Sequence, residues 1–348
     1  MLTKEDAKKI KGIAIILMLM YHLFYFKDRI YGGGVISIIS NSLVENIGKF
    51  GNICVPIFFF LSGYGLYINS KKKEYDLFYR IKKIYLDYWK IFIIFVPIAI
   101  ILFKYQPSSA YVEFVSNRYN HFSIIEFIKC FIGIEPIYNG EWWFIRSYVI
   151  ALISFPLLKI IIDKNKPSIN IFITMILSIV LYDVIPLLKI GSNPLFYTFI
   201  NQTVHITSFI MGMIFASSDM FKKIDKSLEK NNYYGIIKDI LFIGLIFFLR
   251  NYQYGEQFDL LFVPMFILFA LDFIKRIKIT DKVLMLLGDN STNMWLIHTF
   301  YCYYIYYIVK LVLLPKYSIL CLLLLIIISL ITSIIIEYIY KQIKRMIK

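Results

Sequence analysis

Residues 317–340 read YSILCLLLLIIISLITSIIIEYIY, and the only charged residue among them is Glu337. A helix needs about 20 mostly apolar residues to cross the hydrocarbon core of a bilayer. This stretch therefore predicts a transmembrane helix. The same criterion, the length of an apolar run, is applied to the rest of the chain.

The composition of the whole chain also indicates a membrane protein. Hydrophobic residues make up 59% of the 348 residues and charged residues 18%, whereas soluble domains average roughly 45–50% and about 25%. The mean hydropathy is +0.67. A soluble fold cannot bury so much apolar surface, and the same composition excludes a disordered chain, a collagen-like chain and a disulfide-stapled secreted scaffold.

Ten segments are apolar enough to be candidate spans. They are 11–27, 48–69, 84–104, 142–162, 169–188, 195–216, 235–251, 257–274, 285–309 and 317–340. No small-residue cleavage site follows the first of them, so we expect a retained helix there and not a signal peptide. The predicted fold is an all-α transmembrane bundle of about ten spans, forming a single domain over residues 1–348.

The distribution of positive charge predicts the orientation of these spans. The chain has 38 Lys and Arg against 23 Asp and Glu, a formal net charge of +15. If the N-terminus is cytoplasmic, 25 of the 38 cations fall in the predicted cytoplasmic segments and 10 in the outer ones. This asymmetry follows the positive-inside rule. It predicts that both termini are cytoplasmic, and it explains the basic charge without nucleic acid as a partner.

The other sequence motifs exclude several kinds of chemistry. The four cysteines form no CxxC pair, so we interpret them as packing residues and not as disulfides or metal ligands. No Walker A, HExxH or Rossmann motif is present, which leaves ATP, a metal ion and nicotinamide without support.

The longest outer segment, 105–141, contains an apolar piece, Ile124–Ile134, that is too short to span the membrane. We expect this piece either to lie at the membrane interface or to re-enter the bundle.

The first span contains two residues that an anchoring helix does not need. It reads Lys11-Gly-Ile-Ala-Ile-Ile-Leu-Met-Leu-Met-Tyr-His22. Eleven helical steps make three turns plus about 20°, so Lys11 and His22 share one stripe about 16 Å apart. Gly12 lets a neighbouring helix approach closely. A histidine in a membrane helix is either a proton-transfer group or a structural hydrogen-bonding residue, and Lys11 is either functional or a headgroup anchor.

Four further motifs follow the Lys11–His22 run along the chain. They are Val55-Pro-Ile-Phe-Phe-Phe-Leu-Ser-Gly-Tyr64, Arg80-Ile-Lys-Lys83, Trp142-Trp-Phe-Ile-Arg146 and Gly288-Asp-Asn-Ser-Thr-Asn-Met-Trp-Leu-Ile-His298. In this order the five motifs resemble the acyltransferase-3 family of bacterial integral-membrane O-acyltransferases. The first-helix pattern of that family is Arg, ten residues, His, with Lys11 here in place of the Arg. The Arg-x-x-Arg motif of the family has Lys83 for its second Arg, and Lys lacks the bidentate fork of Arg.

This resemblance implies an acyl-CoA donor, usually acetyl-CoA, and a cell-surface or lipid-linked glycan acceptor at the bacterial plasma membrane. His22 is then either the general base for an acceptor hydroxyl or the group that carries the acyl. We expect Arg80, Lys82 and Lys83 on a cytoplasmic loop, where they bind CoA phosphates or, alternatively, anionic membrane lipids.

Two further residues are candidates for the catalytic site. His298 is expected at a depth comparable with that of His22, where it orients the thioester or the acceptor, or only bridges helices. Arg146 stabilises an oxyanion, binds an acidic sugar, or forms an ion pair with Glu141 or Asp259.

The remaining histidines and aromatics have simpler interpretations. We interpret His205 as structural and His121 as solvated. Trp142, Trp143 and the tyrosines of Tyr301–Tyr307 are expected in the aromatic belts, with sugar stacking as the alternative for the two tryptophans.

Two other classes of function are compatible with a basic, aromatic, polytopic chain. A glycan flippase or exporter is expected to show internal repeats or charges lining a pore, and no repeat is apparent. A polysaccharide polymerase is expected to have a large, charged outer loop, and segment 105–141 is only moderate in size.

Overall fold

The computed structural model describes residues 2–31, 35, 40–187, 203–225, 232–251, 255–277 and 281–346. Every secondary-structure element in these ranges is a helix, so the all-α prediction is confirmed.

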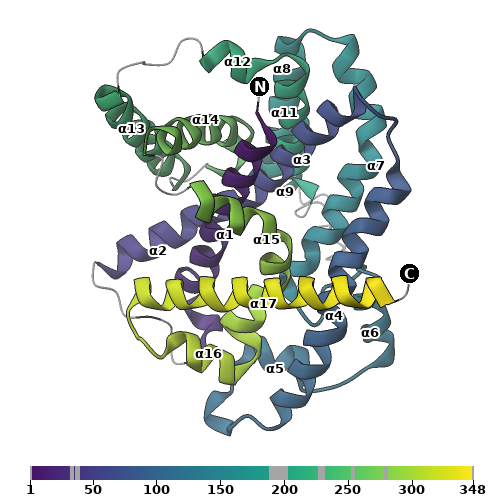
Figure 1. Ribbon diagram of the computed structural model, residues 1–348, viewed down its shortest axis with the longest axis vertical. Helices are drawn as coiled ribbons and strands as arrows, with labels where there is room; N and C mark the ends of the chain where they lie inside the picture. Colours follow the sequence, from purple (N-terminus) through teal and green to yellow (C-terminus); the bar gives the residue numbers. More distant parts are fainter. Residues whose placement is uncertain are drawn as a thin grey trace. The chain divides into compact units, whose positions relative to one another are not determined.

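The α-helices are labelled in Figure 1. They are α1 (Lys4–Phe24), α2 (Asn41–Phe50), α3 (Cys54–Ser70), α4 (Leu77–Lys104), α5 (Glu113–Tyr119), α6 (Ile124–Phe131), α7 (Trp143–Lys164), α8 (Pro167–Ile179), α9 (Ile185–Leu187), α11 (Ile206–Ser217), α12 (Met220–Asp225), α13 (Asn232–Asn251), α14 (Asp259–Ile277), α15 (Asp281–Thr299), α16 (Tyr306–Leu313) and α17 (Ser318–Met346). Short 3₁₀ turns are η1 (Lys27–Arg29), η3 (Gly51–Ile53), η4 (Ser108–Ala110), η5 (Gly140–Trp142) and η7 (Glu256–Phe258), and π turns are η6 (Val180–Val184) and η8 (Phe300–Tyr304).

Six helical stretches of the described chain are long and apolar enough to cross a membrane. They are Asn41–Ser70, Leu77–Lys104, Gly140–Lys164, Pro167–Leu187, Asn232–Asn251 and Ser318–Met346. A seventh results if Asp281–Tyr304 and Tyr306–Leu313, which are bent by 89° at their junction, count as one span. The chain is therefore a multi-pass membrane protein with six or seven candidate spans.

The other three predicted spans are helical where they are described, but they do not reach that standard. Helix α11 has 12 residues, and residues 195–202 of the predicted span 195–216 lie outside the described residues. Helices α1 and α14 carry charges within one or two turns of their ends. The count of ten spans stays a prediction, as does the cytoplasmic placement of both termini.

The chain forms two compact units, each built from three stretches. Unit 1 comprises Met1–Ala14, Ile53–Phe78 and Ser147–Gly288, and unit 2 comprises Ile15–Asn52, Tyr79–Arg146 and Asp289–Lys348. Helices α1 and α15 each begin in unit 1 and end in unit 2.

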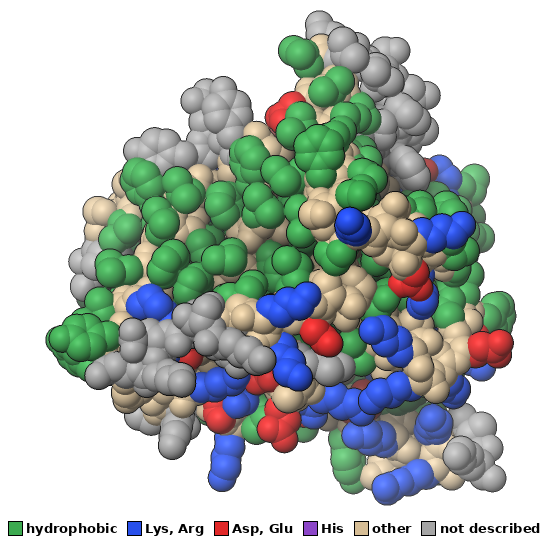
Figure 2. All heavy atoms as spheres, turned by 90° about the horizontal axis from the view of Figure 1, so that it is seen from above, with side chains coloured by type: hydrophobic (Ala, Val, Ile, Leu, Met, Phe, Trp, Pro, Cys, Tyr) green, Lys and Arg blue, Asp and Glu red, His purple; other side chains and the backbone are tan. Residues whose placement is uncertain are grey.

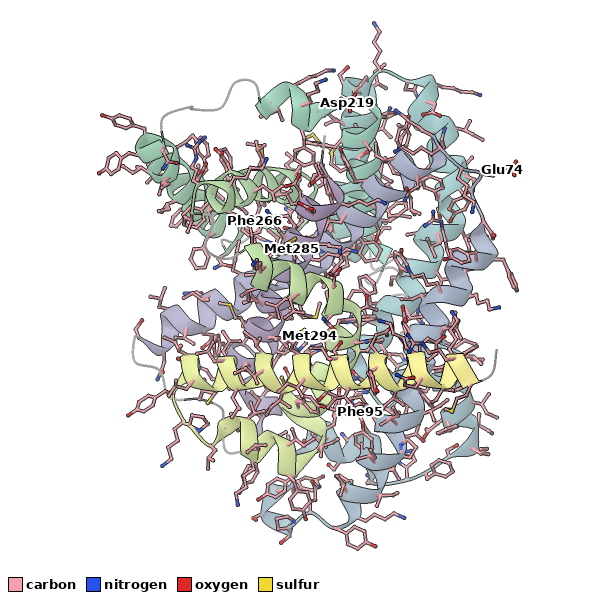
Figure 3. All side chains as sticks on the ribbon, in the orientation of Figure 1. Glu74, Phe95, Asp219, Phe266, Met285 and Met294 are labelled. Carbon is pink, nitrogen blue, oxygen red and sulfur yellow. The ribbon has the colours of Figure 1, made fainter. Side chains whose placement is uncertain are left out.

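Unit 1 is built around the close contact of α3 with α11. A Cβ on Gly63 would lie 2.0 Å from the Phe209 carbonyl oxygen, and one on Gly212 would lie 2.1 Å from the Phe60 carbonyl oxygen. Only glycine permits backbones this close, which gives the Ser-Gly of the second sequence motif a packing role. A left-handed residue, Asp219 (φ 52°), labelled in Figure 3, lies between α11 and α12.

Unit 2 has an aromatic core. The Trp142 indole is buried, packs edge-on against Tyr88 and donates a hydrogen bond of 3.1 Å to the Leu296 carbonyl oxygen. Phe95 of α4 and Met294 of α15, labelled in Figure 3, belong to the same core. The prediction of an interfacial or sugar-stacking role is therefore wrong for Trp142, because its ring is enclosed by other aromatic rings.

Helix α17, the long yellow helix of Figure 1, packs on unit 2 through a stripe of small side chains. Ser333 donates to Asn290 Oδ1 at 2.8 Å, and Tyr301 donates to Thr332 Oγ1 at 2.8 Å. Up to Ile336, the other side chains of α17 are mostly apolar and exposed or half-buried, and the charged residues of the helix follow from Glu337 onward. Figure 2 shows apolar side chains covering wide areas of the visible surface, as expected for helices that face lipid.

The predicted outer segment 105–141 is mostly helical and lies in unit 2. In α6, Ile124, Ile125 and Ile128 are exposed, while Cys130 is buried. This amphipathic pattern favours a helix lying at the membrane interface over one that re-enters the bundle. Burial raises the pKa of the Cys130 thiol, and all four cysteines are buried, as packing residues are.

Candidate active site

The two histidines singled out in the sequence lie side by side in unit 2. His22 is in the last turn of α1 and His298 in the last turn of α15, and their ring centroids are 4.7 Å apart. His22 is 3% exposed and His298 is fully buried. The two histidines that the sequence places at a comparable depth are thus in contact, and their depth in a membrane stays a prediction.

Glycines let the helices that carry these histidines approach one another. In unit 1, a Cβ on Gly12 would lie 2.2 Å from the Leu284 carbonyl oxygen, and one on Gly288 would lie 2.0 Å from the Lys8 carbonyl oxygen. The close approach expected at Gly12 is therefore present. Each glycine precedes a histidine of the site by ten residues, so the same spacing recurs on α1 and α15.

Two neighbours of His22, and a cation beside one of them, were not identified from the sequence as part of its surroundings. The Tyr303 hydroxyl oxygen is 3.0 Å from Nδ1 of His22, and Oε2 of Glu141 is 3.8 Å from Nε2. The other carboxylate oxygen of Glu141 is 3.7 Å from the Arg29 guanidinium. Nδ1 of the ring is thus hydrogen-bonded to a phenol, and Nε2 faces a carboxylate that lies beyond hydrogen-bond distance.

His298 has one satisfied and one unsatisfied nitrogen. Its Nδ1 lies 2.6 Å from the Trp295 carbonyl oxygen, and because a carbonyl only accepts, Nδ1 is the donor. Its buried Nε2 has no hydrogen-bond partner among the described residues. In the neutral ring this nitrogen holds a lone pair.

Aromatic rings and arginines border the His22 side of the site. The Arg29 guanidinium lies 3.7 Å from the centre of the Phe26 ring and 4.5 Å from that of Phe114. Arg118 lies 4.8 Å from the same Phe114 ring and donates to the carbonyl oxygen of Ile137. These contacts fix the positions of both guanidinium groups, and Arg29 is the one that lies near Glu141.

Lys11 and Arg146 have separate surroundings. Lys11 is half-buried on α1, and Arg146 donates a hydrogen bond of 3.0 Å to the Ile134 carbonyl oxygen. The carboxylates considered as ion-pair partners of Arg146 have other cations close by. Glu141 lies near Arg29, and Asp259 forms hydrogen bonds to Arg250 of 2.6 and 2.9 Å.

The expectation of a loop for Arg80, Lys82 and Lys83 is wrong, because α4 begins at Leu77 and all three lie in its first two turns. The apolar Leu77, Phe78 and Tyr79 extend the helix beyond the predicted span. Lys82 and Lys83 are exposed and Arg80 is half-buried.

The belt assignment of Tyr301–Tyr307 is also wrong for part of that run. Tyr301, Tyr303 and Tyr304 are buried within the π turn η8, whereas Tyr307 is exposed. His205 is buried at the start of α11 and His121 is largely exposed beside Glu126.

Residues 10–338 match the model of acyltransferase family 3, described as an acyltransferase domain. The chain belongs to the acyltransferase-3 family. It is accordingly an enzyme that transfers an acyl group from a donor to an acceptor. Comparisons with curated proteins and with solved structures found no match.

Proposed function

We propose that this acyltransferase-3 protein transfers an acetyl group from cytoplasmic acetyl-CoA to a hydroxyl of a cell-surface or lipid-linked glycan. The observation that carries this proposal is the contact between the buried rings of His22 and His298 in a member of this family. Nε2 of His298 has no hydrogen-bond partner among the described residues. Burying an imidazole nitrogen without a hydrogen bond costs free energy in an apolar bundle. This cost favours a site in which a bound substrate supplies the missing hydrogen bond.

In this proposal Nε2 of His22 is the general base. It takes the proton of the acceptor hydroxyl as that oxygen attacks the thioester carbonyl carbon. The carbon–sulfur bond breaks, and the CoA sulfur receives the proton from Nε2. Glu141, 3.8 Å away, stabilises the transient imidazolium, and His298 orients the acceptor through its free Nε2.

The alternative route uses the same nitrogen as a nucleophile. Nε2 of His22 would attack the thioester, release the CoA thiolate and pass the acetyl group to the hydroxyl. A donor labelled in the acetyl group, added without acceptor and quenched rapidly, separates the two routes: label on the protein supports acyl transfer through His22, and its absence supports direct transfer.

Arg80, Lys82 and Lys83 are proposed to bind the phosphates of CoA. They cluster at the start of α4, where the free backbone N–H groups of the helix also favour an anion. We expect the double substitution Arg80→Gln/Lys83→Gln to raise the KM for acetyl-CoA about tenfold. The control Lys71→Gln/Lys72→Gln removes equal charge from the turn before α4 and should leave that KM within about twofold.

Lys11 and Arg146 are proposed to serve the same reaction, Lys11 by binding the donor and Arg146 by stabilising the developing oxyanion or binding an acidic sugar. A bacterial plasma-membrane location with both termini in the cytoplasm completes the proposal. It supplies the donor from inside and the glycan from outside.

The decisive experiment uses purified protein in liposomes with [¹⁴C]acetyl-CoA, together with a lipid extract of the source cells as the acceptor pool. Base-labile label on a glycan lipid, lost in His22→Ala, supports the proposal. Movement of labelled glycan across the bilayer without acylation would instead identify a flippase, and full transfer by His22→Ala would remove the central role of that residue.

A further inference from the structure

The hydroxyl of Tyr303 contacts two atoms of the same residue. It lies 2.7 Å from the carbonyl oxygen of His22 and 3.0 Å from Nδ1 of its ring. Helix α1 ends at Phe24, so the His22 carbonyl is one of the last four of the helix and has no partner in a following turn. Tyr303 is 4% exposed, which shields both contacts from water.

Counting protons fixes the direction of both hydrogen bonds. A phenol has one hydrogen to donate, and a carbonyl oxygen can only accept. The Tyr303 hydrogen therefore points to the carbonyl, and the Tyr303 oxygen accepts from Nδ1 of His22. Nδ1 must then carry a hydrogen, which leaves the lone pair of the neutral ring on Nε2.

Glu141 acts in the opposite sense. Its Oε2 lies 3.8 Å from Nε2, and a carboxylate there favours the tautomer in which Nε2 carries the hydrogen. In that tautomer Nε2 carries a hydrogen and has no lone pair, so it cannot accept a proton from the acceptor hydroxyl. The two neighbours of His22 thus compete for its tautomer, and only Tyr303 makes a hydrogen bond within normal distance.

The π turn η8 presents Tyr303 to His22. The Ile305 N–H donates to the Phe300 carbonyl oxygen at 2.9 Å, the i→i+5 bond of a π turn, and α16 then departs at 89°. π turns disrupt regular helix geometry and occur frequently at functional sites. The Tyr303 ring also packs edge-on against Phe114, which fixes its position.

We propose that Tyr303 is a positioning residue that holds His22 in the tautomer with hydrogen on Nδ1, so that Nε2 is the base. The inference rests on the proposed role of His22 as base, but the tautomer itself is measurable without any turnover. In this proposal Glu141 stabilises the His22 ring after Nε2 has accepted the proton.

The test is solid-state NMR of protein in lipid bilayers with ¹⁵N-labelled histidine, recorded where the rings are neutral. The chain has four histidines, and the His22 signals are identified by their loss in His22→Asn. We expect Nδ1 of His22 to be protonated in the native protein and mainly Nε2 to be protonated in Tyr303→Phe. Because the wrong tautomer lacks the base, kcat of Tyr303→Phe should fall about 100-fold, with both KM values within about threefold.

A neighbouring tyrosine supplies the matched control. Tyr301 lies in the same π turn, and its hydroxyl bonds to Thr332, so Tyr301→Phe removes one hydrogen bond without touching His22. It should leave the tautomer unchanged. The double variant Tyr303→Phe/Glu141→Gln removes the opposing charge and should return part of the population to the Nδ1-protonated form.

The outcomes separate the two claims. If Tyr303→Phe keeps the native tautomer, or if Tyr301→Phe changes it equally, the positioning role is overturned whatever the activity. If Tyr303→Phe changes the tautomer but the native protein acetylates no glycan, the positioning role stands and the proposed function is overturned.

Discussion

The histidine pair of unit 2 and the Arg250–Asp259 pair of unit 1 are both polar groups buried among apolar helices, yet they are satisfied to different degrees. Arg250 and Asp259 form two hydrogen bonds of 2.6 and 2.9 Å. In contrast, Glu141 lies 3.8 Å from His22, and Nε2 of His298 has no partner in the described chain.

This difference in hydrogen bonding distinguishes a buried pair that stabilises the fold from one that can take part in the reaction. A buried ion pair that satisfies itself leaves nothing for a ligand, and removing one partner exposes a bare charge to an apolar surrounding. In the histidine pair, Nε2 of His298 has no hydrogen-bond partner in the described chain, so a substrate that donates a hydrogen bond would satisfy it. We therefore propose that the Arg250–Asp259 pair serves stability and the histidine pair serves catalysis, and the following predictions test this proposal.

The largest effect is expected from His22→Asn. Removing the base should lower kcat about 10³-fold, within the range for general acid–base catalysis, because asparagine keeps polarity but cannot accept the proton. Transfer of labelled acetyl groups in liposomes measures it, with His121→Asn as the exposed control. A loss of less than tenfold would falsify the catalytic assignment of His22.

Asp259→Asn should act on stability instead. It leaves the Arg250 charge buried and uncompensated, and we expect the free energy of unfolding to fall by about 3 kcal/mol. Thermal denaturation in detergent measures this. The double variant Arg250→Met/Asp259→Leu removes both charges and should recover most of the loss, and activity per folded molecule should not change. A catalytic defect in the stable double variant would contradict a purely structural pair.

The sequence predicted the histidines of the site but not their neighbours. His22 and His298 stand out because ionisable residues are rare in apolar helices, so their positions alone mark them. Tyr303 is one of 28 tyrosines, and its role depends on a π turn that no local pattern announces. Glu141 precedes two tryptophans, which favoured an interfacial interpretation until Trp142 proved to be core.

The fold was predictable for a similar reason. Apolar length identifies the helices of a membrane protein, and seven of the ten expected spans correspond to the six long helices and the bent pair. Length does not indicate where a helix breaks or which face is buried. The bend after Tyr304 follows a π turn whose tyrosines are buried, and α4 begins at Leu77, before the apolar run that defined the predicted span. Apolar length alone therefore missed both.

His298→Asn should have an intermediate effect. The amide nitrogen of asparagine takes the place of Nδ1 and can keep the hydrogen bond to the Trp295 carbonyl, but asparagine has no atom in the place of Nε2. We expect kcat to fall about 30-fold, or about 2 kcal/mol of transition-state stabilisation. The control is His205→Asn, a buried histidine of unit 1, which should change kcat less than threefold. Equal losses in both variants would mean that the loss of any buried imidazole, and not the place of His298 beside His22, decides the effect.

The smallest effect is expected at Asp239. This residue tests whether charge compensation or hydrogen bonding makes a buried polar group structural. Asp239 is fully buried, and neither of its carboxylate oxygens has a hydrogen bond in the described chain. By that measure it resembles His298. However, its oxygens lie 3.4 Å from Lys238 and 3.4 Å from Arg276, and both cations also contact Asp272. Its charge is therefore compensated although its hydrogen bonds are not.

If charge compensation is what makes a buried group structural, Asp239→Asn should cost about 1 kcal/mol of stability and leave kcat within about threefold. Asp272→Asn is the matched control. Its carboxylate accepts hydrogen bonds from Lys238 and Arg276, so this variant should lose more stability, about 2 kcal/mol, again without a catalytic effect. Thermal denaturation and labelled acetyl transfer on the same samples measure both quantities. A fall in kcat with unchanged stability in Asp239→Asn would show that an unsatisfied carboxylate in unit 1 also takes part in the reaction, and the two units would then not differ in the way proposed.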